Sequence, residues 1–157
     1  MTVFGTIIAH NFLWCQYRNR SGLAKTQGPV MVGIAWVANA LSLFGLYLYT
    51  QMDFYRFKDP VVLNRMMWEW FHAFKLSFFL GSLLIFLLGY FFYRIPAVYQ
   101  QIITETLSQT EERQKKIAKR GFRYFIGSLW VLILVYAFLS WLFVHWGLLD
   151  VFQLSTN

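Results

Sequence analysis

Three long stretches of this chain contain no Asp, Glu, Lys or Arg, and they limit its fold more than any other feature. The stretches lie between Lys25 and Asp53, between Lys75 and Arg94, and between Arg123 and Asp150. An α-helix rises about 1.5 Å per residue, so about 20 apolar residues cross the hydrocarbon core of a bilayer. The middle stretch has 18 residues and needs 70–74 as an extension, with Lys75 snorkelling to the surface. The sequence therefore predicts three transmembrane helices, at 29–50, 70–93 and 123–149.

The composition agrees with a membrane protein. Of the 157 residues, 58% are hydrophobic and 13% are charged. An ordinary soluble domain has about 45–50% apolar and about 25% charged residues. A chain of this length is too short to bury the apolar excess in one core. We therefore expect an all-α fold that forms a single membrane domain over residues 1–157.

The basic residues predict the orientation of the helices. With three crossings, the N-terminal segment and the connection after the second span lie on one side of the membrane, and they carry ten of the 14 Lys and Arg residues. Because basic residues collect on the cytoplasmic side, we expect the N-terminus in the cytoplasm and the C-terminus outside. A bacterial inner membrane is the expected location. This anchoring explains the net charge of +7, so no nucleic-acid partner is predicted.

Two segments outside the spans are expected to be helical. Residues 3–17 are apolar but too short to span, and their apolar residues fall near one helical face, which favours an interfacial helix on the cytoplasmic leaflet. The alternative is that this segment docks against another subunit. Residues 94–122 are expected to form a cytoplasmic helical hairpin that contacts anionic lipid or a cytoplasmic partner. Within it, Ser108 and Glu111 have the spacing of a capping box, which predicts a new helix near Gln109.

Polar groups are scarce inside the spans. No span centre contains an ionisable side chain, and such side chains usually mark transport or proton relay. Asn39 is the most polar group near a midplane, and we expect it to hydrogen-bond to another helix. Small residues near Asn39 and in the second span are expected to let helices approach closely. The helix-packing candidates are Ala38, Asn39, Ser42, Ser77 and Gly81.

Two histidines form the one arrangement that indicates a cofactor. His72 precedes Arg94 by 22 residues, and His145 follows Arg123 by 22 residues. Their side chains would lie at matching depths, about 33 Å from the inner edge, on antiparallel helices. Bis-histidine ligation of haem b uses this arrangement, while two histidines in an interfacial aromatic belt are the competing explanation. Glu69 and His72 form a single E-x-x-H pair, and no metal site is predicted because di-iron bundles need two.

The sequence contains no catalytic signature. It lacks a nucleophile elbow, a P-loop, an H-E-x-x-H motif and a glycine-rich nucleotide fingerprint, so no catalytic residue is assigned and an enzyme is not favoured. The favoured function is a non-catalytic accessory subunit of a respiratory, photosynthetic or secretion complex, with other integral-membrane subunits and lipid as partners. The alternatives are a haem b or quinone-binding anchor in electron transfer, and a homo-oligomeric pore or transporter.

Overall fold

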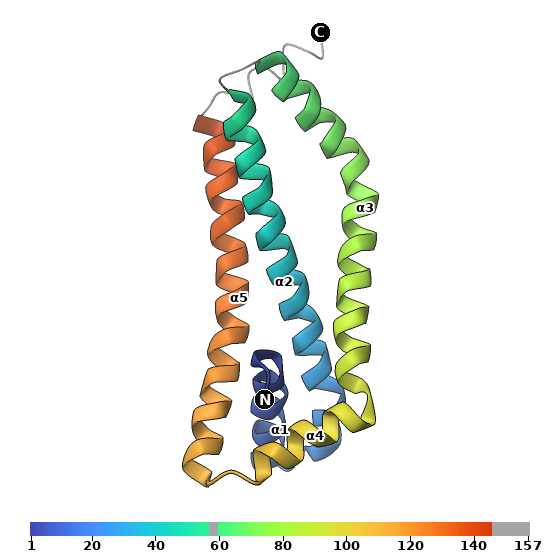
Figure 1. The fold of residues 1–157 in the computed structure, drawn as a ribbon, viewed down its shortest axis with the longest axis vertical. Helices are drawn as coiled ribbons and strands as arrows, with labels where there is room; N and C mark the ends of the chain where they lie inside the picture. Colours follow the sequence, from blue (N-terminus) through green and yellow to red (C-terminus); the bar gives the residue numbers. More distant parts are fainter. Residues whose placement is uncertain (57–59, 146–157) are drawn as a thin grey trace.

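The computed structural model describes the backbone of residues 1–56 and 60–145 and, within it, the side chains of 1–51, 77–142, 144 and 145. Five helices make up this part of the chain (Figure 1). They are α1, Val3–Tyr17; α2, Ser21–Arg56; α3, Pro60–Arg94; α4, Pro96–Leu107; and α5, Glu111–His145. No strand occurs among these residues, and the fold is all-α, as predicted.

Three of the helices are long and apolar enough to cross a membrane, which confirms the prediction of a multi-pass membrane protein. The candidate spans are Ser21–Gln51 in α2, Ser77–Arg94 in α3 and Glu111–Leu142 in α5. Each of these helices has 35 or 36 residues, so each extends beyond a hydrocarbon core of about 30 Å. The predicted spans 29–50 and 70–93 fall inside α2 and α3, and the last residues of 123–149 lie outside the described part of the chain.

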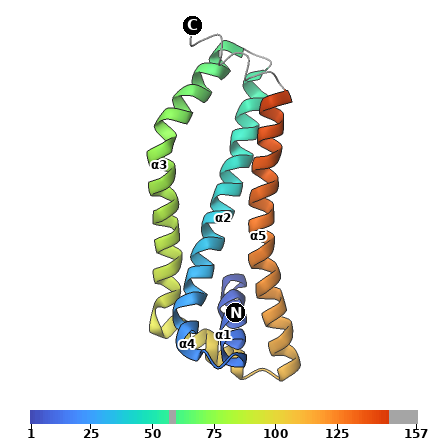
Figure 2. The same cartoon turned by 180° about the vertical axis from the view of Figure 1, so that it is seen from behind.

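α2 is the central long helix, because both α3 and α5 pack along it. α2 and α5 run side by side, while α3 lies close to α2 near α4, bows away from it along its middle and returns toward it at the opposite end (Figures 1 and 2). We call the end that contains α1 and α4 the basic end, because the predicted cytoplasmic cations collect there. They are Arg18, Arg20, Lys25, Arg94, Arg113, Lys115, Lys116, Lys119, Arg120 and Arg123.

α1 lies among the other helices at the basic end. It packs against α5, α2 and α4, and the side chains of Ile7, Ile8 and Ala9 are fully buried. Gly5 and Thr6 are buried as well, so residues 5–9 are buried all the way around the helix, beyond the single stripe that an amphipathic interfacial helix shows. The buried faces of α1 are therefore covered by helices of its own chain. The depth of α1 relative to a membrane surface stays a prediction.

A tight turn reverses the chain between α1 and α2. Asn19 has a φ of 53°, in the left-handed region that Asn tolerates better than most residues. The backbone N–H of Arg20 donates to the carbonyl oxygen of Cys15 at 2.8 Å. The Asn11 side-chain amide then donates to the carbonyl oxygen of Ala24 at 3.2 Å, which holds the start of α2 against α1.

α4 crosses the basic end and connects α3 to α5 (Figure 1). It begins at Pro96, in the first turn, where the missing N–H of proline is harmless. The predicted role of Ser108 in starting the next helix is wrong. Its hydroxyl donates to the carbonyl oxygen of Glu105 at 2.9 Å and so closes α4, and α5 begins at Glu111. A serine hydroxyl can bond to backbone on either side, and here the preceding turn wins.

The closest approach of α1 to α5 is at Gly121. A Cβ at this position would overlap the backbone of Thr6 and would also crowd Ile7. Any side chain here must therefore push α1 away from α5. Gly127, six residues further along the same helix, has no described atom within 4 Å of an added Cβ.

This contrast predicts opposite effects for two alanine substitutions in one helix. Gly121→Ala is expected to lower the free energy of unfolding by about 1–3 kcal/mol, which is the usual cost of overpacking. Gly127→Ala is the matched control, and it should be neutral or stabilising because alanine favours a helix by up to about 1 kcal/mol. Unfolding in mixed micelles of increasing denaturing detergent measures both. Equal stabilities of the two variants would contradict the close α1–α5 contact.

Candidate functional site

Asn39 makes a polar contact between α2 and α5 through its side chain. Its side-chain amide donates to the hydroxyl oxygen of Tyr124 at 2.9 Å, so the two residues form an interhelical hydrogen bond. Ala38 is buried beside it. Ser42 is buried too, and its hydroxyl donates to the Ala38 carbonyl oxygen at 2.7 Å, within α2. An amide and a phenol that bond to each other can align two helices.

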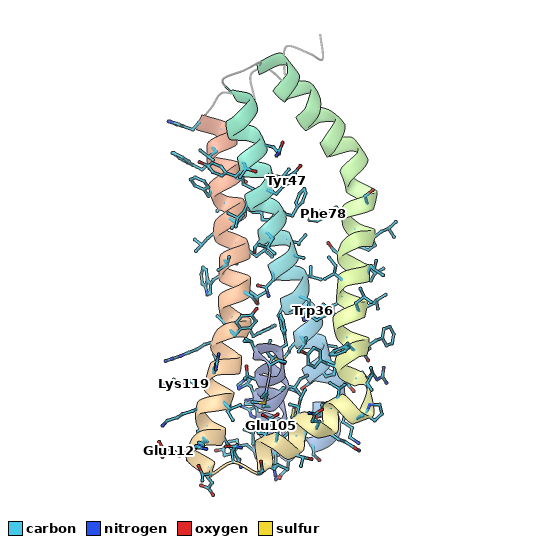
Figure 3. All side chains as sticks on the ribbon, viewed as in Figure 1. Trp36, Tyr47, Phe78, Glu105, Glu112 and Lys119 are labelled. Carbon is cyan, nitrogen blue, oxygen red and sulfur yellow. The ribbon has the colours of Figure 1, made fainter. Side chains whose placement is uncertain are left out.

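The small pair on α3 has a different environment. Ser77 is exposed, and no described atom lies within 4 Å of a Cβ added at Gly81. α3 instead approaches α2 at Gly89, where an added Cβ would lie 3.3 Å from the Cα of Gly33 and 3.1 Å from the ring of Trp36. Figure 3 shows Trp36 between α2 and α3. The predicted packing residues do not include this crossing, although glycine in two apolar spans was an available signal.

An apolar groove continues from Gly81 along α3 toward the basic end. It has a volume of about 750 Å³ and is lined by Leu84, Leu87, Leu88, Phe91, Phe92, Arg94 and Ile95. Helical spacing places part of this lining on the same face as the small pair. We call this surface the α3 outer face, and its residues are Ser77, Gly81, Leu84, Leu88 and Phe92.

Of the two histidines proposed as haem ligands, the structure describes the side chain of His145 but not that of His72. His72 lies within α3, but its side chain is outside the described residues. His145 is exposed at the end of α5, and its ring stacks on Trp141 with the ring centroids 4.9 Å apart. Their pairing and the binding of haem b therefore stay predictions. Within the described part of the chain, no group of three or more His, Cys, Asp or Glu residues has an arrangement that holds a metal ion.

The single cysteine lies in a small polar cluster between α1 and α2. The Cys15 thiol is 3.5 Å from Oε1 of Gln27 and 3.8 Å from Oδ1 of Asn11. Burial raises the pKa of the Cys15 thiol, and the nearby Arg20 opposes that shift without cancelling it. The thiolate is the reactive form of cysteine, so this environment disfavours nucleophilic or redox chemistry at Cys15.

A cationic groove lies at the basic end, between α5 and the start of α1. It has a volume of about 510 Å³ and is lined by Val3, Lys116, Lys119, Arg120, Arg123 and Tyr124. Lys116 forms an exposed ion pair with Glu112 at 2.8 Å. Among the residues described, the other three cations form no ion pair. Figure 3 shows Lys119 projecting away from the bundle. The basic cluster could be predicted from the sequence, but the groove could not, because Val3 of α1 supplies part of its lining.

Comparison of the chain with known protein families, curated proteins and solved structures gave no match. The function is therefore argued from the contacts of the chain itself. Two surfaces take no part in the helix contacts described above. They are the α3 outer face, with its small residues, and the cationic groove on α5.

The bond between Asn39 and Tyr124 is expected to stabilise the α2–α5 pair modestly. Hydrogen bonds between transmembrane helices average about 0.6 kcal/mol and reach about 1.7 kcal/mol. A double-mutant cycle with Asn39→Ala and Tyr124→Phe should give a coupling energy in this range from the free energies of unfolding. Pairing Asn39→Ala with Tyr90→Phe, whose hydroxyl contacts Arg94 on α3, is the control and should give a coupling near zero. A coupling near zero in the first cycle would count against the bond.

His10 provides a separate test of how α1 packs. Its ring lies between α1 and α5, with its centroid 5.1 Å from that of Phe122. Burial lowers the pKa of His10 below its usual 6.5, and a backbone hydrogen bond with Ala118 opposes this shift in part. The folded state therefore binds a proton less readily than the unfolded state does.

The sign of the pH dependence follows from this shift. The contribution of His10 to stability is complete above pH 6.5, and it falls as the pH drops below 6.5 toward the lowered pKa of the folded state. His10→Gln removes the titration. We expect the wild type to lose more thermal stability than His10→Gln between pH 7.5 and pH 5. Parallel curves for the two proteins would mean that His10 is not buried against α5.

Proposed function

We propose that the chain is a non-catalytic accessory subunit of a larger membrane complex and that α3 is the helix by which it joins that complex. The observation that carries the proposal is the outward direction of the small pair Ser77 and Gly81. The glycines at the helix contacts of the fold, such as Gly33 and Gly121, already meet atoms of a neighbouring helix. Gly81 could allow an equally close approach, but no atom of a neighbouring helix lies within 4 Å of a Cβ added there, among the described residues.

The physical argument depends on how helices associate in lipid. Lipid tails are as apolar as leucine, so apolar surface alone does not drive one helix onto another. Small residues spaced four apart let two backbones approach, and the larger side chains around them then pack in contact. On α3 the small pair is flanked along the α3 outer face by Leu84 and Leu88, which are 59% and 56% exposed. A partner helix that lies along this face would cover all four residues.

The nature and location of the complex belong to the same proposal. The ten cations at the basic end would lie in the cytoplasm, with the N-terminus inside and the C-terminus outside a bacterial inner membrane. The span centres contain no ionisable residue, which favours a supporting role over transport or proton relay. A respiratory, photosynthetic or secretion complex would supply the integral-membrane partners, and residues 94–122 would face any cytoplasmic partner.

Gly81→Leu is expected to remove the partner chains from the complex purified from its native membrane in mild detergent. We expect the yield of co-purifying subunits to fall by about tenfold, which corresponds to about 1.4 kcal/mol of association free energy. Leu83→Phe is the matched control, because it adds bulk to an exposed position on a different face of α3. A lone, monodisperse monomer in the wild type, or equal retention by both variants, would rule out this role for α3.

A cross-linking measurement identifies the neighbour of α3 directly. A single cysteine introduced by Ser77→Cys, in a Cys15→Ala background, carries a short photo-activated probe. Capture of a chain that also co-purifies with the wild type supports the accessory-subunit role. Capture of a second copy of this chain alone would favour a homo-oligomer instead.

A further inference from the structure

The cations of the groove on α5 have few anionic neighbours. Glu112 pairs with Lys116, both of them largely exposed to solvent, and Glu105 pairs with the amino group of Met1. Lys119, Arg120 and Arg123 form no ion pair among the residues described. The Tyr124 ring makes one wall, held by its bond from Asn39. The groove therefore brings together three cations that no carboxylate among the described residues pairs with.

An apolar track continues from this groove along α5. Residues spaced three or four apart share one helical face, and from Arg123 this face runs through Gly127 to a series of large apolar side chains. We call that series the outer stripe of α5: Trp130, Leu134, Phe138 and Trp141, which are 58%, 62%, 49% and 56% exposed. At Gly127, no described atom lies within 4 Å of an added Cβ, so a notch separates the cations from the stripe.

We propose that this surface binds one anionic phospholipid, with its phosphodiester group in the cationic groove and an acyl chain along the notch and the outer stripe of α5. The guanidinium groups of Arg120 and Arg123 suit the phosphate oxygens, because a planar fork of donors matches them. The notch at Gly127 gives the glycerol backbone or the first part of the acyl chain a path from the groove to the stripe. This inference does not rest on the proposed function, which concerns α3.

The combination of charge and apolar track is what favours a lipid. A free phosphate or an acidic peptide would use the cations alone and would leave the outer stripe without a role. A bilayer lipid carries a charged head directly above an apolar chain, which is the order in which Arg123, Gly127 and Trp130 occur along α5. The uncharged run that begins after Arg123 places this boundary at the start of the predicted third span, 123–149.

The test uses the purified full-length chain in a mild non-ionic detergent. Native mass spectrometry measures the binding of phosphatidylglycerol and of phosphatidylcholine with the same acyl chains. We expect preferential binding of phosphatidylglycerol. The double variant Arg120→Gln/Arg123→Gln should weaken it by about 30-fold, which corresponds to about 2 kcal/mol for two basic residues. Arg113→Gln/Lys115→Gln removes the same charge from the same helix outside the groove and should change binding by less than about threefold, since only long-range attraction is lost.

Further arms separate the lipid from other anions. Gly127→Leu keeps every charge and fills the notch, so it should weaken phosphatidylglycerol binding severalfold while circular dichroism and the thermal transition stay unchanged. Inorganic phosphate or glycerol 3-phosphate should not displace the lipid at equal concentration. Displacement by either would assign the groove to free phosphate, and displacement by polyglutamate would assign it to an acidic protein partner. Equal weakening by the two charge variants, or no effect of Gly127→Leu, would also overturn the proposal.

Discussion

Close backbone contact at glycine is the interaction on which the arrangement of these helices depends. Because a bilayer gives no hydrophobic drive for one apolar helix to leave lipid for another, helices in it associate where their surfaces fit closely. Gly121 allows α1 to lie against α5, Gly33 and Gly89 allow α2 to cross α3, and Gly45 lies against Val135 between α2 and α5. These contacts fix the central place of α2 and the position of α1. The wall that α1 contributes to the cationic groove, Val3, depends on the first of them.

The fold class and the three candidate spans could be predicted because the bilayer discriminates strongly against charge. A charged residue inside a span costs several kcal/mol, so runs of about 20 uncharged residues have few alternative explanations. The hydrogen bond from Asn39 to Tyr124 is a contact whose partner could not be predicted in this way. An amide inside a bilayer needs a partner, but which residue supplies it depends on the rotation of two helices about their axes. Side-chain packing sets that rotation, and a linear pattern does not contain it.

The positions that the sequence could not resolve are those where one residue type fits two environments. Gly81 and Gly89 lie eight residues apart on α3, which is about 80° around a helix with 3.6 residues per turn. The first faces outward and the second meets Trp36, although both appear as glycine in an apolar run. Ser108 has the spacing of a helix start and serves as a helix end. α1 has large apolar residues on one face, yet Thr6 and Ala9 on other faces are also buried, because α2, α4 and α5 all pack against it.

Gly127 on α5 and Gly81 on α3 both lack a described atom within 4 Å of an added Cβ, but their surroundings favour different neighbours. Gly127 lies four residues after Arg123, about 6 Å along α5, so whatever occupies its notch also meets the cations of the groove. Gly81 lies six residues after Lys75 and 13 residues before Arg94, but these cations lie about 120° and about 140° around α3 from it, and its own face consists of apolar and small side chains over several turns. A lipid needs charge at one end of an apolar track, whereas a partner helix needs several turns of close approach without charge. The same residue type therefore favours lipid on α5 and protein on α3, because Arg120 and Arg123 share the helical face of Gly127 and no cation shares the face of Gly81.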